Sequence, residues 1–317
     1  MDTFSHILIA FLLLGKFDLN LAVFAGVMAL IIDLDVLLFP LTKKYPHFDH
    51  RGLVHSVLGV ICVTLVASLI YSGLTGMNYW LSLGAGLLGA FSHTICDTLT
   101  NYGTLSLWPF VKKYVKLDIN PGISPLTTIV STISIPFLYY SYEGSNLVVF
   151  NNVYLIASVF FVIYFIIRIS LKSYIQFKFH TKSLPNFNPF KYKLVQIAQY
   201  KESDQEYKEI KWRTINLITG KSTEEGQIHY PLMNSTPPLD TDEKMISFSY
   251  KTTPIQRILA HSDYHLYEIL EKNEDAMIIF WYVLEFTIGK WRMGATIALK
   301  RDGTYQTARM YPSLKNH

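Results

Sequence analysis

Histidine and aspartate side chains, which are frequent metal ligands, recur in four short clusters of an otherwise apolar sequence. Ionisable groups in lipid-facing sequence are costly and rare, so they are functional candidates by default. Each cluster could contribute to one shared site. The clusters are His6, Asp33-Leu34-Asp35, His50-Arg51-Gly52-Leu53-Val54-His55-Ser56 and His93-Thr94-Ile95-Cys96-Asp97.

The spacing within two clusters restricts how their side chains act together. His93 and Asp97 are four residues apart, which places both on one face of a helix. Asp33 and Asp35 are two residues apart, so they cannot face the same way on a regular helix. We expect one of these aspartates to bind a metal ion and the other to support a ligand by hydrogen bonding.

Imidazole together with carboxylate favours a divalent transition metal over calcium or magnesium. Zinc is the first expectation, with manganese, iron or nickel as alternatives. A catalytic zinc ion needs about three or four ligands, so the candidates are sufficient for one or two ions. These candidates are His6, Asp33, Asp35, His50, His55, His93 and Asp97.

Each cluster also has an ordinary structural explanation. His6 could be a helix contact, and the aspartates of the second cluster could form an ion pair with Arg51. The histidines of the third cluster could be one solvated and one core residue, and His93 with Asp97 could form a hydrogen bond between helices. All four clusters lie at one predicted depth, which favours a shared site.

Three further histidines are predicted to be surface residues. His47 lies on the same loop as the third cluster, three residues before His50. His261 and His265 have the four-residue spacing of a metal pair on a helix, but no other ligand cluster accompanies them.

The first 170 residues have the composition of a membrane domain. Half of the 317 residues are hydrophobic and only 16% are charged, which is more apolar than an ordinary soluble domain. Most of the apolar runs approach the roughly 20 residues needed to cross a bilayer. They predict an all-α polytopic membrane bundle of about six helices. The runs are Phe4–Phe17, Leu21–Phe39, Leu53–Tyr71, Tyr79–Cys96, Leu126–Tyr142 and Val153–Ile169.

The charges of the connecting loops predict an orientation. Basic residues lie in the loops 40–52 and 99–125 and after Arg168, whereas residues 73–78 have no charge and residues 143–152 have only Glu143. The positive-inside rule places the basic loops and the C-terminal domain in the cytoplasm. All four clusters then lie near the cytoplasmic leaflet of the inner or plasma membrane.

The C-terminal part has a different charge balance. Residues 1–170 contain as many basic as acidic residues, whereas residues 171–317 have a surplus of four basic residues. This surplus is too small for nucleic-acid binding and suits a position beside anionic lipid headgroups. We predict a membrane domain over 1–170, a linker over 171–190 and a cytoplasmic domain over 191–317.

The cytoplasmic domain is predicted to be a small, β-rich α+β fold. Pro254–Lys272 has apolar residues at helical spacing, and Asp302-Gly303 is a hairpin turn signal. The remaining runs are rich in β-branched and aromatic residues, which favours strands. They are Lys191–Tyr200, Glu206–Ile218, Lys244–Tyr250, Ala276–Ile288, Gly294–Lys300 and Thr304–Met310.

The cysteines and the N-terminus restrict other interpretations. Cys62 and Cys96 lie in apolar segments, which indicates neither a disulfide framework nor a thiolate metal site. The N-terminus lacks the basic region of a signal peptide, so we expect the first apolar run to be retained.

The same clusters resemble a known family. Their order, with Thr98, Thr100 and Gly103 after the fourth cluster and then Trp108-Pro109, resembles the YdjM-type, or LexA-binding, inner-membrane-associated metal-dependent hydrolases. The resemblance covers about residues 1–170. Ile32 and Val54 stand where the family usually has Pro and Thr, and neither change removes a ligand.

The resemblance implies metal-dependent hydrolysis at the cytoplasmic membrane surface, on a phosphoester or lipid-like substrate. Part of the likeness is to zinc-dependent phospholipases C, which also use a His-x-x-x-Asp pair. In this mechanism Asp35 or His50 would act as general base, and Arg51 would bind phosphate or stabilise developing negative charge.

Two other functions are consistent with the sequence. The chain could be a non-catalytic metal-binding anchor whose C-terminal domain recruits a protein partner of unknown identity. It could also be an ion transporter, although polar residues then would be expected across the full depth of the membrane.

Overall fold

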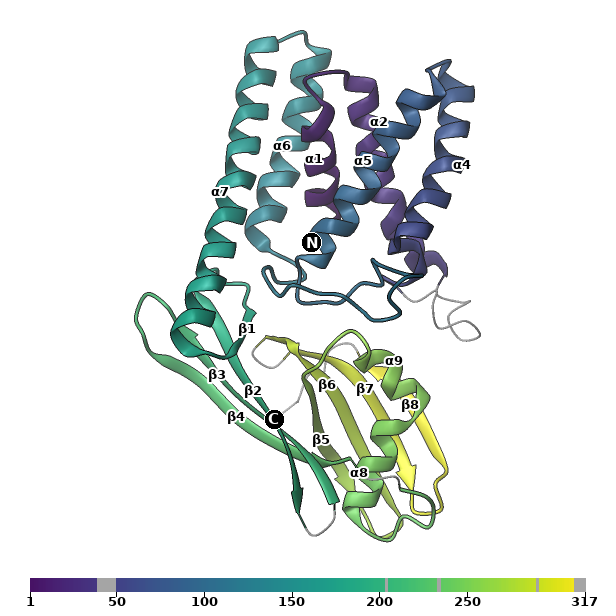
Figure 1. Cartoon of the computed structure of the whole chain (residues 1–317), viewed down its shortest axis with the longest axis vertical. Coiled ribbons are helices and arrows are strands. Elements are labelled where there is room, and N and C mark those ends of the chain that lie inside the picture. Colours follow the sequence, from purple (N-terminus) through teal and green to yellow (C-terminus); the bar gives the residue numbers. More distant parts are fainter. Residues whose placement is uncertain (39–49, 203–204, 233–234, 289–290, 311–317) are drawn as a thin grey trace. The chain divides into compact units, whose positions relative to one another are not determined.

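The computed structural model describes residues 1–38, 50–202, 205–232, 235–288 and 291–310 (Figure 1). The chain divides into two compact units, Met1–Tyr174 and Ile175–His317, which we call the helical unit and the β unit. The predicted surface histidine, His47, lies outside the described residues, as do the loop lysines before it.

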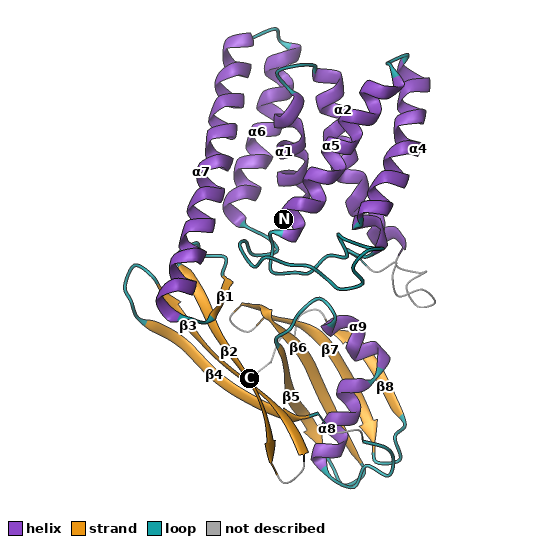
Figure 2. Ribbon diagram, viewed as in Figure 1, coloured by secondary structure: helices purple, strands orange, loops and turns teal. Residues whose placement is uncertain are grey.

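The helical unit confirms the predicted helical N-terminal part, because each of the six apolar runs forms an α-helix (Figure 2). Helix α2 packs against α1 and α5, while α4 packs on α5 and α6 on α1. Two short 3₁₀ helices, η1 and η3, join these helices near the candidate ligands. The elements are α1 (Thr3–Leu14), α2 (Leu19–Asp33), η1 (Leu34–Leu38), η3 (Leu53–His55), α4 (Val57–Thr75), α5 (Tyr79–Thr98), α6 (Pro125–Glu143) and α7 (Leu147–Phe179).

Short polar residues begin the helices that carry the clusters. Asp2 begins α1 and its carboxylate accepts a hydrogen bond from Ser5 N. Asp18 begins α2 and its carboxylate accepts a hydrogen bond from Leu21 N. Ser56 begins α4 and its hydroxyl accepts from Gly59 N at 3.0 Å. Such caps satisfy backbone donors that have no partner within the helix. The cap at Ser56 fixes the end of η3, so it also fixes His55 directly before it.

Two glycines permit the close approaches that bring the clusters together. A Cβ atom on Gly89 would lie 2.1 Å from the carbonyl oxygen of Ala25, so only glycine lets α5 approach α2 this closely. A Cβ atom on Gly59 would lie 2.1 Å from the carbonyl oxygen of Leu53, so glycine also lets η3 fold onto α4. The first approach brings α2 near His93, and the second positions His55.

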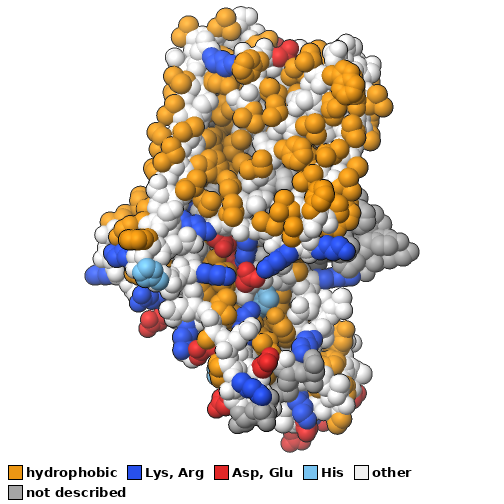
Figure 3. All heavy atoms as spheres, viewed as in Figure 1, with side chains coloured by type: hydrophobic (Ala, Val, Ile, Leu, Met, Phe, Trp, Pro, Cys, Tyr) orange, Lys and Arg blue, Asp and Glu red, His pale blue; other side chains and the backbone are white. Residues whose placement is uncertain are grey.

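The outer surface of the helical unit is strongly apolar. Figure 3 shows hydrophobic side chains over most of the visible face of this unit. Among the described residues, three helices are long and apolar enough to cross a membrane. They are α2 continued by η1 (Leu19–Leu37), α4 and α7. An apolar exterior with buried histidines and aspartates is the arrangement expected of a membrane protein.

The β unit contains two four-stranded antiparallel sheets with the strand orders β1-β2-β3-β4 and β5-β6-β7-β8. Two helices, α8 and α9, join the sheets and pack on the second one. The elements are β1 (Lys182–Pro185), β2 (Lys191–Glu202), β3 (Gln205–Asn216), β4 (Ser222–Pro231), α8 (Asp242–Lys251), α9 (Thr253–Leu259), β5 (His265–Lys272), β6 (Ala276–Ile288), β7 (Trp291–Lys300) and β8 (Tyr305–Met310).

Two predicted elements of the β unit are wrong. Residues 244–250 lie in helix α8 instead of a strand, because Thr241 caps the helix and acidic residues occupy its first turn. The predicted helix Pro254–Lys272 ends at Leu259. Residues 265–272 instead pair with β6 as strand β5, so tertiary pairing outweighs the local periodicity.

Other features of the β unit match or extend the prediction. The hairpin turn at Asp302-Gly303 is confirmed, with Gly303 at φ +87°. Strand β4 had no sequence prediction. Residues 171–190, the predicted linker, contain the end of α7 and strand β1.

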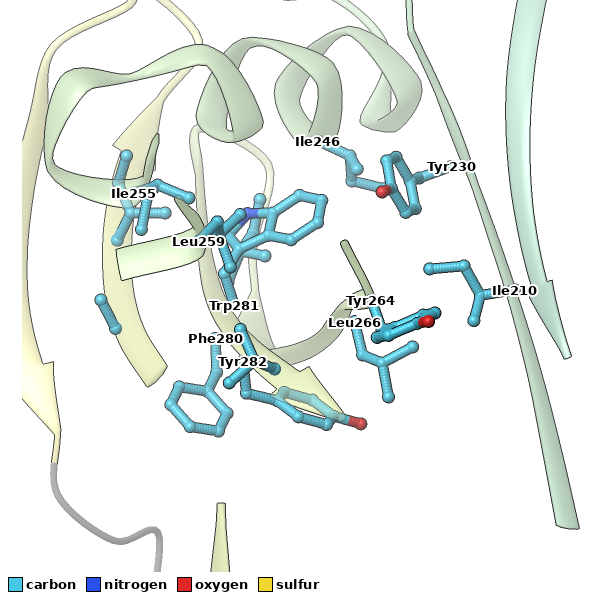
Figure 4. Close-up of a cluster of buried hydrophobic side chains, with 14 of the residues drawn as sticks. Ile210, Tyr230, Ile246, Ile255, Leu259, Tyr264, Leu266, Phe280, Trp281 and Tyr282 are labelled. Atoms are coloured by element: carbon cyan, nitrogen blue, oxygen red, sulfur yellow. The ribbon is translucent and has the colours of Figure 1, made fainter. Parts of the chain in front are cut away.

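The core of the β unit contains apolar side chains from both sheets and both helices (Figure 4). Trp281 lies at its centre, and its indole nitrogen donates to Ser249 Oγ at 2.9 Å. The rings of Tyr230 and Trp281 meet edge to face with centroids 5.3 Å apart. This geometry is favourable for aromatic pairs.

Candidate metal centre

Four side chains from three different elements converge at one end of the helical unit. Asp33 ends α2, His55 ends η3, and His93 and Asp97 lie one turn apart on α5. One ligand atom from each lies within 4.8 Å of all the others. The structure thus brings together members of the second, third and fourth sequence clusters.

The separations between these atoms match those of a tetrahedral metal site. Zinc bonds of about 2.0–2.2 Å place neighbouring ligand atoms about 3.3–3.6 Å apart. The observed separations are 3.2 Å between the Nε2 atoms of His55 and His93, 3.4 Å from His93 Nε2 to Asp33 Oδ1, 3.6 Å from Asp97 Oδ2 to each Nε2 atom, and 3.8 Å from His55 Nε2 to Asp33 Oδ1.

Each carboxylate has one oxygen held by a protein donor and the other directed at this group. Thr3 Oγ1 donates to Asp33 Oδ2 at 2.7 Å, so Oδ1 faces the histidines. Arg51 Nη2 donates to Asp97 Oδ1 at 2.9 Å, and the amino group of Met1 lies 2.5 Å from the same oxygen. Among the described residues, Asp97 Oδ2 is buried without a hydrogen-bond partner. A bound ion is one partner that such a buried acceptor can have.

Asp35 makes a second group with different spacing. Its Oδ2 lies 2.9 Å from His55 Nδ1, and its Oδ1 lies 2.7 Å from His50 Nδ1. The backbone N–H of Arg51 also donates to Oδ2 at 3.1 Å. The contacts of His50 and of the Arg51 N–H with Asp35 are hydrogen bonds, whereas His55 Nδ1 lies close to Asp35 without hydrogen-bond geometry. Asp35 therefore stands behind the ring of His55, where carboxylates commonly support metal-binding histidines.

Arg51 is buried beside Asp97. Its Nη1 donates to Thr100 Oγ1 at 2.8 Å and to the carbonyl oxygen of Tyr102 at 2.9 Å. Its guanidinium lies 5.0 Å from the ring centroid of Tyr102. Arg51 has φ +63°, an uncommon backbone conformation for a residue with a side chain. These contacts fix the side chain against Asp97.

His6 lies behind the four-residue group. Its Nε2 is 3.1 Å from Asp97 Oδ1, the oxygen that faces away from the histidine pair. Its ring stacks on that of His93 with centroids 3.8 Å apart. The structure therefore places His6 against two ligand candidates, but not in the four-residue group itself.

The charge of the site favours a cation. Asp33, Asp35 and Asp97 supply three carboxylates, and Arg51 and the amino group of Met1 supply two positive charges, so one negative charge remains when the imidazoles are neutral. Buried charge of one sign requires compensation, and one divalent ion would supply it.

The donors, their spacing and the unpartnered oxygen of Asp97 together fit one divalent metal ion. Zinc suits two imidazoles and two carboxylates in a tetrahedron. The second group, Asp35 with His50 and His55, also has ligand atoms within 4.8 Å of one another, and one hydrogen bond joins His50 to Asp35 within it. Manganese, iron and nickel accept similar donors.

Sequence reasoning missed Thr3, which holds Asp33, and gave no role to Thr100, which accepts a hydrogen bond from Arg51. Thr3 precedes His6 by less than one helical turn, but a threonine near a helix start has no specific signal in a single sequence. His261 and His265, predicted to be on the surface, are in fact buried. His265 Nε2 lies 2.7 Å from the carbonyl oxygen of Ser262, so this histidine is held within the β unit.

An apolar helical unit with a buried histidine and aspartate cluster defines a membrane protein with a candidate metal site. Residues 1–170 match the family model of the YdjM inner membrane protein. The chain therefore belongs to the YdjM family, as the sequence clusters predicted. The family match and the apolar helices together indicate a membrane location.

The chain is also similar to a curated protein of Bacillus subtilis (strain 168), "Uncharacterized protein YfhP". The two are 28% identical over 136 residues, which cover 42% of this chain and 39% of YfhP. The match thus spans well under half of the relative. No solved structure matches the chain.

Proposed function

We propose that this protein is a membrane hydrolase that uses one divalent metal ion, held by Asp33, His55, His93 and Asp97. The supporting observation is the uneven exposure of these ligands. The side chain of Asp33 is 18% exposed, whereas those of the other three are at most 1% exposed. Of these four ligands, Asp33 is therefore the one that a substrate can reach.

A divalent ion bound there would lower the pKa of a water molecule and polarise a phosphoryl or carbonyl oxygen. The protein supplies the remaining functions through its own residues. His50 is the candidate general base, since Asp35 holds its Nδ1 and its side chain is 43% exposed. With Nδ1 donating to Asp35, the other ring nitrogen has the lone pair that accepts a proton.

Hydrolysis of an ester or phosphoester then balances as follows. The water oxygen forms a bond to the carbon or phosphorus atom, and the bond to the leaving oxygen breaks. His50 takes the proton from water and returns it to the leaving oxygen. Arg51 is a positioning residue in this proposal, because its buried guanidinium donates to Asp97 and Thr100 instead of facing a substrate.

We further propose that the site lies at the cytoplasmic face, with six membrane crossings and a cytoplasmic β unit. The ligands come from the end of α2, the segment before α4 and the end of α5, so they share one side of the bundle. The basic loops on that side support the cytoplasmic assignment.

The experiment combines metal analysis with a substrate panel. The purified full chain is loaded with the metal found by elemental analysis and assayed on phosphoesters, phospholipids and carboxylic esters. We expect His93→Ala to lose both metal and turnover. His50→Gln should retain the metal and lose about 10²–10⁴-fold in turnover, the usual contribution of a general base. His229→Gln, at an exposed histidine of β4, is the matched control and should change neither.

A structural metal is the second candidate function. Four protein ligands are enough to fill a tetrahedral site, which is typical of structural zinc sites, whereas catalytic sites keep an open position. This candidate predicts bound metal and no hydrolysis of any substrate in the panel. Turnover that survives His93→Ala would contradict the hydrolase proposal directly.

A further inference from the structure

The helical unit has an apolar groove of about 420 Å³ that begins one helical turn from the candidate metal centre. Helix α1 forms its floor, with α2 on one side and α6 on the other, and these helices lie side by side in Figure 1. Leu8 and Leu138 are buried at its base, while Val23 and Val27 line its rim and are about half exposed.

The groove is aligned with the candidate metal centre. On α2 the lining residues Leu19, Val23, Gly26 and Leu30 follow one another at three- or four-residue spacing, so they form one stripe. Asp33 is the next member of that stripe.

Helix α1 repeats this pattern. Phe11 and Ile7 line the groove, and Thr3 follows them at the same four-residue spacing. Thr3 and Asp33 are joined by a hydrogen bond of 2.7 Å. The two stripes thus end at the one ligand of the centre that is partly exposed.

Polarity along the groove is confined to its ends. Asn20 and Glu143 lie at the end far from the centre, where Tyr71 also donates to the backbone oxygen of Asn20. Between these residues and the Thr3–Asp33 pair the lining is apolar, apart from the hydroxyl groups of tyrosines at its edge. This pattern suits a ligand with a long apolar body and a polar group at one end.

We infer that this groove binds one acyl chain of a membrane lipid and places the polar ester or phosphoester of that lipid at Asp33. From Leu19 to Leu30 the stripe is about 16 Å long at 1.5 Å per residue. That length is about half of the roughly 30 Å hydrocarbon core, the depth that an acyl chain of one leaflet occupies. The inference deepens the proposed function, on which it rests, by naming a lipid as the substrate class.

The size of the groove favours an acyl chain over a helix from a second copy. A helix with its side chains is about 10 Å across. An acyl chain is thinner and needs no polar partner along its length. The exposed rim on α2 opens toward the surface that the apolar exterior assigns to lipid, so a chain can enter sideways.

The test uses a phosphatidic acid with a diazirine at the end of one acyl chain, incorporated into phosphatidylcholine vesicles with the metal-loaded full chain. After irradiation, labelled residues are mapped by mass spectrometry. We expect labelling to concentrate on the groove, chiefly near Phe11 and Val23. Val27→Trp fills the groove and should reduce that labelling about tenfold, the effect of ~1.4 kcal/mol.

Val66→Trp is the matched control. Val66 lies on α4 outside the groove and is also exposed, so this change adds the same indole to the lipid-facing surface. It should leave groove labelling unchanged. Labelling spread evenly over all exposed helices, or unaffected by Val27→Trp, would overturn the inference. So would an unlabelled groove in a chain that native mass spectrometry finds as a dimer.

Failure of the groove inference can be distinguished from failure of the proposed metal-dependent hydrolysis. If the metal proposal fails, the chain binds no metal or shows no turnover, but labelling still depends on Val27. If the groove inference fails, metal and turnover can persist while labelling does not depend on Val27. A turnover assay with lipid esters of short and long acyl chains then gives a second readout. Long chains should be favoured in the parent chain and in Val66→Trp, and not in Val27→Trp.

Discussion

His265 in the β unit and His93 in the helical unit are both buried, but their ring nitrogens meet different partners. His265 Nε2 lies 2.9 Å from the carbonyl oxygen of Leu259, and its Nδ1 lies 3.1 Å from the hydroxyl of Tyr250. Burial lowers its pKa to about 4. His93 Nε2 instead faces another imidazole nitrogen and two carboxylate oxygens at 3.2–3.6 Å.

The buried carboxylates of the two units differ in the same way. In the β unit both oxygens of Glu285 lie 2.6 Å from Ser262 Oγ. In the helical unit Asp97 Oδ2 has no hydrogen-bond partner among the described residues. Buried polar groups normally have partners, so Asp97 Oδ2 can accept a bound ion, whereas the oxygens of Glu285 already have a partner in the β unit. Burial of a histidine or an aspartate alone does not make this distinction.

The largest effect is expected for Asp97→Asn, which removes the charge from the unpartnered oxygen. Metal binding should weaken by more than about 100-fold, beyond the roughly 10–100-fold typical of supporting residues. Titration of the purified chain against a chromogenic chelator measures this change. Glu285→Gln alters a buried carboxylate of the β unit and should leave metal affinity unchanged. Equal effects of the two substitutions would remove the distinction between the units.

Asp97 also accepts from Arg51, so folding of the variant needs its own measurement. Protection of the backbone amides of α4 and α5 from hydrogen exchange measures whether the variant is folded. Protection retained in Asp97→Asn, together with lost metal, assigns the effect to the ligand. Metal-free parent protein supplies the reference pattern, because structural change due to metal loss alone is already present there.

An intermediate effect is expected for Asp35→Asn. The amide can still contact one imidazole, but it cannot accept hydrogen bonds through both of its polar atoms. Metal binding should weaken by about 10–100-fold, because His55 loses the carboxylate that supports it. Asp18→Asn is the control, since Asn also caps helices well and Asp18 lies at the other end of α2. A stronger effect than that of Asp97→Asn would make Asp35 a direct ligand.

The smallest effect is expected for Thr3→Val, which removes the hydrogen bond to Asp33 Oδ2 with little change of shape. A single hydrogen bond contributes about 0.5–1.4 kcal/mol, so metal binding should weaken about 2- to 10-fold. Thr3→Ser restores the hydroxyl and should restore the affinity. Failure of serine to do so would mean that Thr3 contributes by packing alone.

Local sequence predicted much of the helical unit and less of the β unit. The apolar runs are long and uniform, so helices form wherever a cap permits, and the spacing of His93 and Asp97 already places them on one face. In the β unit, residues 265–272 have both helical and strand patterns. Their pairing with β6 decides the outcome, and that partner lies too far along the chain for local periodicity to reveal.

The sequence by itself determined which side chains are candidates for a metal centre, because charged groups are conspicuous in apolar sequence. The order of the helices also predicts that all four clusters lie at the same end of the bundle. Only the tertiary structure decided which of them face one another. The close approach at Gly89 brings α2 to α5, and the fold of η3 turns His55 toward both. Asp33 thereby joins the four-residue group and Asp35 stands behind His55. The two-residue spacing shows that the two aspartates face different ways, and the fold decides which of them faces the group.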